Sequence, residues 1–193
     1  QYGTCATFAT TGALNAVYAL SDSSRVSQLC NLELGRSLND PNSADGGWNG
    51  SFDRIVFQQI NQYGYLDMQY QRSTGCGGIK EYPLDEWSST GHSMKAENFT
   101  PYSIKTFTGN DWTPITAYNG DFSPLDSDSA TAALNKTKSA LSQGYRVVFG
   151  TLIDGALGGA GAVGKYNNVD EDTWVTTAQM ADDVENQSSL VGH

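Results

Sequence analysis

Three cysteines and two histidines are the residues of this 193-residue chain best suited to nucleophilic chemistry. The cysteines are Cys5, Cys30 and Cys76, an odd number, so one disulfide would leave one free thiol. A thiolate is a strong nucleophile, and a nearby histidine would hold it ready as an ion pair. His92 lies in a turn-rich segment that favours a solvated ring, whereas His193 follows a short apolar run that predicts entry into a strand.

A predicted helix over residues 5–20 would position the first cysteine. Cys5 stands in its first turn, where the helix N-terminus stabilises a thiolate over a thiol. The segment carries no charge, and Thr and Ala fill its other face, which predicts a helix inside a domain. Its apolar positions at helical spacing are Phe8, Ala9, Ala13, Ala16, Val17 and Leu20.

Further elements follow from spacing and stop signals. The apolar stripe of residues 51–63 predicts a second helix, which Gly64 ends. Residues 129–142 predict a third helix with its alanines and leucines inward, ended by Gly144. The apolar run in residues 145–153 predicts a buried strand.

Two motifs suggest ligands but lack the context that the chemistry needs. Residues 159–165 match a Gly-x-Gly-x-x-Gly pattern, but acidic residues without an apolar stripe follow them, so we expect a surface loop. The carboxylates of Asp170, Asp172, Asp182 and Asp183 lack EF-hand spacing and predict a solvated acidic face. We therefore expect no metal and no cofactor.

Composition restricts the partners and the location of the protein. The net charge of −10 and the pI near 4.4 repel phosphate backbones, which argues against nucleic-acid binding. No segment is apolar over the roughly 18 to 20 residues that a membrane span needs. A composition low in Lys and rich in Gly, Ser, Thr, Asn and Tyr is typical of an exported protein, either secreted or periplasmic.

Several segments, taken in order, resemble the papain-like (C1 family) cysteine peptidases, especially their bacterial members. The segment Gln-Tyr-Gly-Thr-Cys-Ala-Thr-Phe-Ala resembles the surroundings of the family's nucleophile, and Asp-Gly-Gly-Trp resembles its substrate-cleft strand. The resemblance covers nearly the whole chain because the order of the segments agrees throughout. The matching residues are 1–9, 45–48, 62–66, 81–83, 142–150 and 191–193.

The resemblance implies a fold. We expect an α+β papain-like domain over residues 1–193, with a mainly helical and loop half in 1–125 that contains a buried central helix. A β-rich half would occupy 126–193, with the active-site cleft between the halves. The family's oxyanion-hole Gln lies two residues further upstream than Gln1, and its catalytic Asn follows the His. We therefore expect the domain to be incomplete at both ends.

The resemblance also implies an activity. The protein would be a thiol protease, a hydrolase in which Cys5 attacks the peptide bond and His193 serves as base and then as acid. Gly46 and Gly47 would pair with the substrate backbone as an added strand or would form a plain turn, and Trp48 would form either a cleft wall or part of the core. The expected partners are a peptide or protein substrate and an inhibitory propeptide, and we expect a monomer.

The disulfides of the family indicate which two of the three cysteines would pair. Tyr2 and Ala44 occupy the positions of one common family bridge, so both of its partners are missing together. Cys30 and Cys76 fall where a second family bridge would lie. The resemblance therefore implies a Cys30–Cys76 disulfide and a free Cys5.

Two other classes of protein remain open. The separation of Cys5 and His193 is longer than the roughly 130 to 150 residues typical of papain and cathepsins, which insertions would explain. A Cys–His acyltransferase or transglutaminase-like enzyme would use the same nucleophile with an amine as acceptor. A catalytically inactive binding module of the same fold would bury Cys5.

Overall fold

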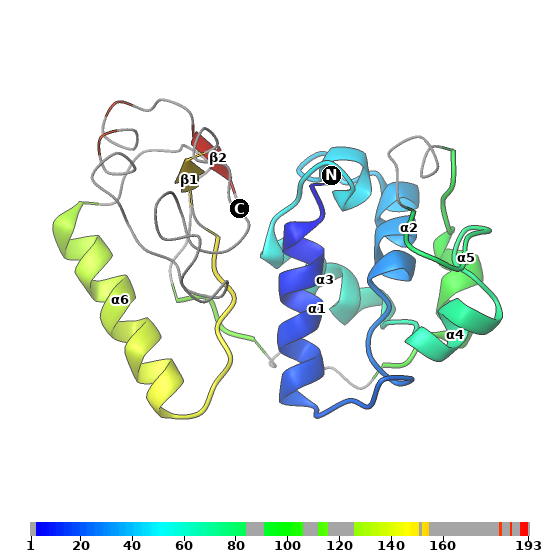
Figure 1. The fold of residues 1–193 in the computed structure, drawn as a ribbon, viewed down its shortest axis with the longest axis horizontal. Helices are drawn as coiled ribbons and strands as arrows, with labels where there is room; N and C mark the ends of the chain where they lie inside the picture. The colour runs from blue at the N-terminus through cyan, green and yellow to red at the C-terminus, as the bar shows by residue number, and fades with distance from the viewer. Residues whose placement is uncertain are drawn as a thin grey trace, which may run out of the picture. The chain divides into compact units, whose positions relative to one another are not determined.

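The structure, a computed structural model, describes residues 3–83, 91–105, 112–115, 126–150, 152–154, 182, 186 and 190–192. Contacts divide the chain into two units, residues 1–121 with 125–149 and residues 122–124 with 150–193. Short helices make up most of the described part of the first unit (Figure 1). They are α1 (Cys5–Val17), α2 (Gln28–Leu38), α3 (Asp53–Tyr63), α4 (Met68–Ser73), α5 (Ala96–Phe99), α6 (Ser127–Ser142) and the 3-10 turns η1 (Ala44–Gly47) and η3 (Thr100–Tyr102).

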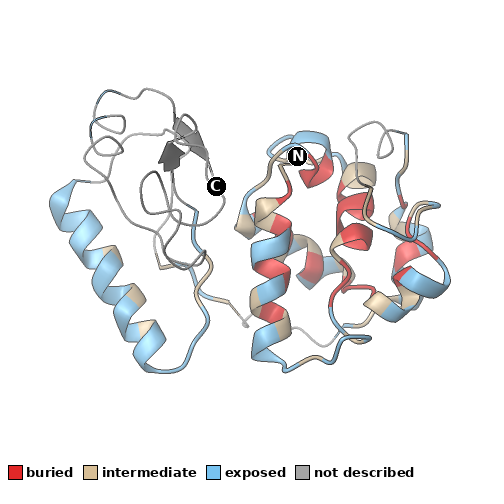
Figure 2. Ribbon diagram, viewed as in Figure 1, coloured by how far each residue is buried: buried red, intermediate tan, exposed pale blue. Residues whose placement is uncertain are grey.

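The most deeply buried helix is α2, for which the sequence analysis predicts no element. All of residues 29–35 are buried, and α2 is the most continuously buried helix in Figure 2. The hydroxyl of Ser27 caps the helix by accepting a hydrogen bond from the Cys30 amide at 3.0 Å. Asn39 ends it in the left-handed conformation, a common helix C-terminus. A buried central helix is therefore present, but it is α2.

Helix α1 confirms the predicted helix, but only one of its faces is buried. Its buried face is formed by threonines, with Thr7, Thr10 and Thr11 at most 2% exposed. Phe8 and Val17, two of the apolar positions at helical spacing, are 42% and 57% exposed. Threonine suits this face because the Thr11 hydroxyl donates to the Thr7 carbonyl at 2.8 Å, which leaves the methyl group free to pack. The prediction that α1 lies inside a domain on all sides is wrong.

Two apolar clusters hold the helices of the first unit together. The larger one surrounds α2 and includes Trp48, Leu66 and Phe99, all at most 1% exposed. The smaller one joins α1 to α3 through Leu14, Val56 and Ile60. Burial of these side chains supplies the main driving force for packing the helices.

The predicted helix over residues 51–63 and its stop are confirmed in α3. It ends at Gly64, which has φ of 78°. A Cβ at Gly64 would lie 2.6 Å from the Ile104 carbonyl oxygen, so only glycine fits there.

The disulfide between Cys30 and Cys76 is present, as predicted. Both cysteines are fully buried. The bridge fastens α2 to the turn that follows α4, where the Cys76 amide donates to the Ile79 carbonyl at 2.7 Å. This leaves Cys5 as the free thiol.

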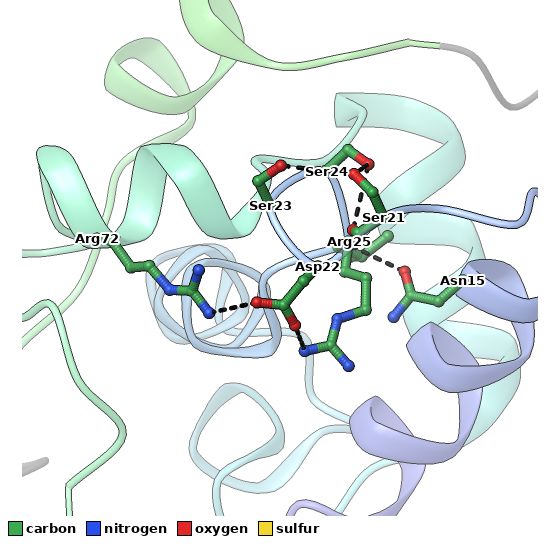
Figure 3. Close-up of polar contacts among 8 residues, drawn as sticks. Asn15, Ser21, Asp22, Ser23, Ser24, Arg25 and Arg72 are labelled. Atoms are coloured by element: carbon green, nitrogen blue, oxygen red, sulfur yellow. Dashed lines mark hydrogen bonds and ion pairs between the residues drawn. The ribbon is translucent and has the colours of Figure 1, made fainter.

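A polar loop connects α1 to α2 and is held at both ends (Figure 3). The Asn15 side chain of α1 accepts a hydrogen bond from the Val26 amide at 2.9 Å. Asp22 accepts from Arg72 of α4 at 3.1 Å and also pairs with Arg25. The Arg72 hydrogen bond, with the charges of Arg25 and Arg72, lowers the pKa of Asp22. The loop therefore links α1, α2 and α4 at the surface.

Within the described residues the expected β-rich second half is not observed, so the predicted α+β class is wrong, and so is the division into a helical and a β-rich half from which the cleft was inferred. In the described residues after position 125, strand is limited to β1 (Leu152–Asp154) and β2 (Leu190–Gly192). These pair antiparallel, with Ile153 opposite Val191. Residues 145–150 form no strand, although Val147 and Val148 are half-buried. A short apolar run becomes a strand only where a neighbouring strand pairs with it.

Helix α6 begins and ends almost where the sequence predicts. Asp126 caps it by accepting from the amides of Asp128 and Ser129. Hydrogen bonds from Ser129 lower the pKa of Asp126. The predicted inward face is wrong, because Leu134 and Leu141 are 52% and 56% exposed. In the portion of the chain described, no helix is both long and apolar enough to cross a membrane.

Candidate functional site

The predicted nucleophile occupies the first residue of α1. Cys5 is half-buried and forms no disulfide. Because the disulfide uses the other two cysteines, Cys5 is the one sulfur that remains available as a thiol. Its position combines a free sulfur with the N-terminal end of a helix.

The hydroxyl of the residue before Cys5 does not cap the helix. Thr4 is the N-cap residue, yet its side chain makes no hydrogen bond to the first-turn amides. The Thr4 hydroxyl instead shares a hydrogen bond of 3.0 Å with the hydroxyl of Tyr82. The first-turn N–H groups around Cys5 are therefore not occupied by this cap, and such groups can stabilise a negative charge on a ligand.

The turn that contains Gly46 and Gly47 lies beside the start of α1. A Cβ at Gly47 would lie 3.5 Å from the Thr7 hydroxyl, and one at Gly3 would lie 2.7 Å from the Asn49 carbonyl carbon. Gly46 and Gly47 belong to η1 and have φ of 66° and 103°, so they form a plain turn and not the cleft strand that the resemblance implies. Gly46 and Gly47 are both buried. Their contact with a substrate stays a prediction.

Gly46 meets α2 backbone to backbone. A Cβ at Gly46 would lie 1.9 Å from the Arg36 amide nitrogen, and one at Gly35 would lie 2.2 Å from the Gly46 carbonyl oxygen. The backbones of α2 and of the turn can approach this closely only where both residues are glycine. The crossing sets the position of the turn against α2.

Trp48 belongs to the core, which resolves the two alternatives left open for it. Its side chain is 1% exposed, and its indole Nε1 donates to Glu33 Oε1 at 3.2 Å. The guanidinium of Arg36 lies over the ring, 5.0 Å from the centroid. Trp48 therefore anchors the turn from inside and does not form a cleft wall.

The structure describes only one of the two histidines, His92. The residues before His193 form β2, which confirms the predicted strand, but His193 itself lies outside the described residues. His92 is half-buried; its Nδ1 lies 3.1 Å from the Gly77 carbonyl oxygen, and its own carbonyl accepts from Arg36. Residues 159–165, Asp170, Asp172 and Asp183 also lie outside the described part.

A buried ionic cluster on α2 was not predicted. Glu33 is fully buried, and its Oε1 accepts from Arg36 Nη1 at 3.3 Å as well as from Trp48. Burial raises the pKa of Glu33 to about 7, against the lowering effect of Arg36 and His92. The only signal in the sequence was a charge inside the apolar run Leu32–Glu33–Leu34.

A surface hollow of about 580 Å³ lies between the end of α2 and α3. Leu38, Asn39 and Tyr63 are part of its lining, which does not include Cys5. We attribute no role in the chemistry of Cys5 to it. Within the described segments, no three His, Cys, Asp or Glu side chains are grouped so that they could hold a metal.

No model of a known protein family matches the chain, and no curated protein is significantly similar to it. The papain-like resemblance and the roles assigned to the site residues therefore stay predictions. The candidate site rests on the free Cys5 and on the groups packed around the start of α1.

Proposed function

We propose that the protein is a cysteine peptidase that hydrolyses peptide bonds with Cys5 as its nucleophile. The observation that carries the proposal is the free, half-buried sulfur of Cys5 at the uncapped start of α1. The papain-like sequence resemblance supports the same role.

The chemistry proceeds in two acyl-transfer steps. The Cys5 thiolate attacks the scissile carbonyl carbon, and amide groups of the first helical turn donate to the developing oxyanion. The leaving amine takes a proton from His193, which leaves an acyl group on the sulfur. Water then attacks the thioester and gives one proton to His193, and the C–S bond breaks, which releases the carboxylic acid and restores the Cys5 thiolate and the protonated His193. The substrate is a peptide or protein segment.

The two histidines allow a matched test. In the native polypeptide, Cys5→Ala and His193→Ala should each lower peptide hydrolysis by at least about a thousandfold. His92→Ala should retain the activity to within a few-fold, because its contacts are to Gly77 and Arg36. Equal activity of the wild type and Cys5→Ala would overturn the proposal.

Product analysis separates hydrolysis from acyl transfer. With an added primary amine, a transglutaminase-like enzyme should convert most of the acyl group into an amide, whereas a peptidase should release mainly the free carboxylic acid. A binding module would release neither product.

We also propose that the protein works in an oxidising compartment, as a secreted or periplasmic enzyme. The buried Cys30–Cys76 disulfide supports this, because such bonds persist mainly outside the reducing cytosol.

A further inference from the structure

Glu33 combines complete burial with incomplete hydrogen bonding. Its Oε1 accepts from Trp48 and Arg36, whereas its Oε2 is buried and has no hydrogen-bond partner among the described residues. A carboxyl group in such a place costs stability that a leucine or methionine would not cost. The surroundings are shaped around it, because a Cβ at Gly77 would lie 2.6 Å from Oε2.

We propose that Glu33 is a positioning residue for the Cys5 site, holding both the Asp45–Trp48 turn and the start of α1. The inference rests on the proposed function of Cys5, and it adds a residue that the sequence resemblance does not assign. Two sets of contacts carry it.

The first set runs through Arg36 to the turn. Glu33 Oε1 accepts from Arg36 Nη1, and the same guanidinium binds Asp45 through both carboxylate oxygens, at 2.9 and 2.7 Å. Asp45 has a left-handed backbone with φ of 49°, which is strained for a residue with a side chain. The fork from Arg36 holds the residue next to Gly46 in this conformation.

The second set runs through Trp48 to Cys5. Glu33 fixes the indole, and the Trp48 ring packs on Tyr82 with centroids 5.4 Å apart. The Tyr82 hydroxyl bonds to the Thr4 hydroxyl, directly before Cys5. Glu33 is thus connected to the start of α1 by packed or hydrogen-bonded side chains at every step.

Ionisation of Glu33 should tighten both sets of contacts. The charged or titratable groups that face it are Arg36 on the same helix, Asp45 on the turn and His92 from the loop before α5. Because its pKa is raised to about 7, the group changes charge between pH 5 and 8. Hydrogen bonds from Trp48 and Arg36 to a carboxylate are stronger than those to a neutral carboxyl.

The test compares two variants in which glutamine replaces a glutamate, which removes the charge and keeps the shape of the side chain. Glu33→Gln keeps an acceptor for Trp48, and Glu97→Gln removes one charge at the exposed surface of α5. For a peptide substrate at pH 8, we expect Glu33→Gln to raise KM about fivefold, with kcat within about twofold of the wild type. At pH 5.5 the two proteins should have the same KM, and Glu97→Gln should match the wild type throughout.

A second measurement does not depend on activity. The indole N–H resonance of Trp48, assigned as the one missing from Trp48→Phe, should shift with pH around a midpoint near 7 in the wild type. In Glu33→Gln the shift should be absent. This readout applies even if the native protein has no peptidase activity.

The outcomes separate the two proposals. If the wild type does not hydrolyse peptides, the proposed function fails, and the titration of the Trp48 indole alone then shows whether Glu33 holds the turn. If the wild type is active but Glu33→Gln has the wild-type KM at pH 8, the peptidase proposal stands and the positioning role is overturned. An indole resonance that does not titrate would also overturn the positioning role.

Discussion

The glycines where α2 crosses η1 show how single residues set the geometry near Cys5. Gly35 and Gly46 face each other across backbone atoms, and Gly46 also has φ of 66°. A side chain at either position would push the turn away from α2. Because the same turn packs against Gly3 and Thr7, the effect would reach the start of α1.

Gly46→Ala should therefore destabilise the protein by at least about 2 kcal/mol, because its Cβ would overlap the Arg36 amide and its φ is unfavourable. Gly12→Ala is the matched control. Gly12 lies on the exposed side of α1 with nothing within 4 Å of an added Cβ, so alanine should stabilise the helix by about 0.5 to 1 kcal/mol. Urea unfolding measures both, and equal midpoints would contradict the close crossing.

At the scale of elements, the threonine face of α1 explains why the sequence did not predict which face of the helix is buried. An apolar pattern identifies the buried side of a helix only if polar side chains cannot be buried at low cost. Thr11 satisfies its hydroxyl within the helix, whereas the Thr10 hydroxyl is buried without a partner. The two threonines should therefore respond differently to the same change.

Thr10→Val should raise the free energy of unfolding by about 1 kcal/mol, because it replaces an unsatisfied buried hydroxyl with a methyl group of the same shape. Thr11→Val removes the hydrogen bond to the Thr7 carbonyl and should be neutral or destabilising by up to about 1 kcal/mol. Valine and threonine have similar helix propensities, so thermal unfolding compares burial alone. A less stable Thr10→Val would contradict this account of the face.

Local signals predicted elements well where the deciding contacts were local. The ends of α3 and α6 follow from Gly64 and Asp126, whose effects operate within one turn. Helix α2 escaped prediction because its apolar residues surround the whole helix and produce no single stripe. The strand expected over 145–153 depended on a distant partner, which the local pattern does not reveal.

Some features of the candidate site were also predicted from the sequence and others were not. The sequence resemblance assigned the Cys30–Cys76 disulfide correctly and left Cys5 free. It did not predict the shape of the glycine turn, because that shape depends on the crossing with α2. Nor did it predict the interior cluster around Glu33, whose partners come from separate parts of the chain.

At the scale of the whole molecule, the disulfide restricts the unfolded chain. Cys30 and Cys76 are 46 residues apart, so loop-closure entropy predicts a stabilisation of about 4 kcal/mol. The double variant Cys30→Ala/Cys76→Ala should lose stability of this order in urea. Dithiothreitol should not lower the stability of the double variant any further. If the oxidised wild type and the double variant were equally stable, the prediction would be contradicted.

Glu33 should make the stability of the molecule depend on pH. Its pKa is raised from an ordinary 4.5 to about 7, so its contribution is fully present below pH 4.5 and is lost as pH rises through 7. The wild type should lose up to about 1.4 kcal/mol per pH unit relative to Glu33→Gln over this range. Urea unfolding at pH 5 and pH 8 measures the difference, and parallel profiles of the two proteins would contradict it.

The central claim is that Cys5 is the reacting nucleophile, and stoichiometric labelling of the native protein with the thiol-reactive epoxide E-64 tests it most directly. The account predicts one epoxide per chain, located on Cys5 by peptide mass mapping, with peptide hydrolysis falling in proportion to the label. A native protein in which Cys5 stays unlabelled, or one that keeps full hydrolytic activity after Cys5 is labelled, would contradict it.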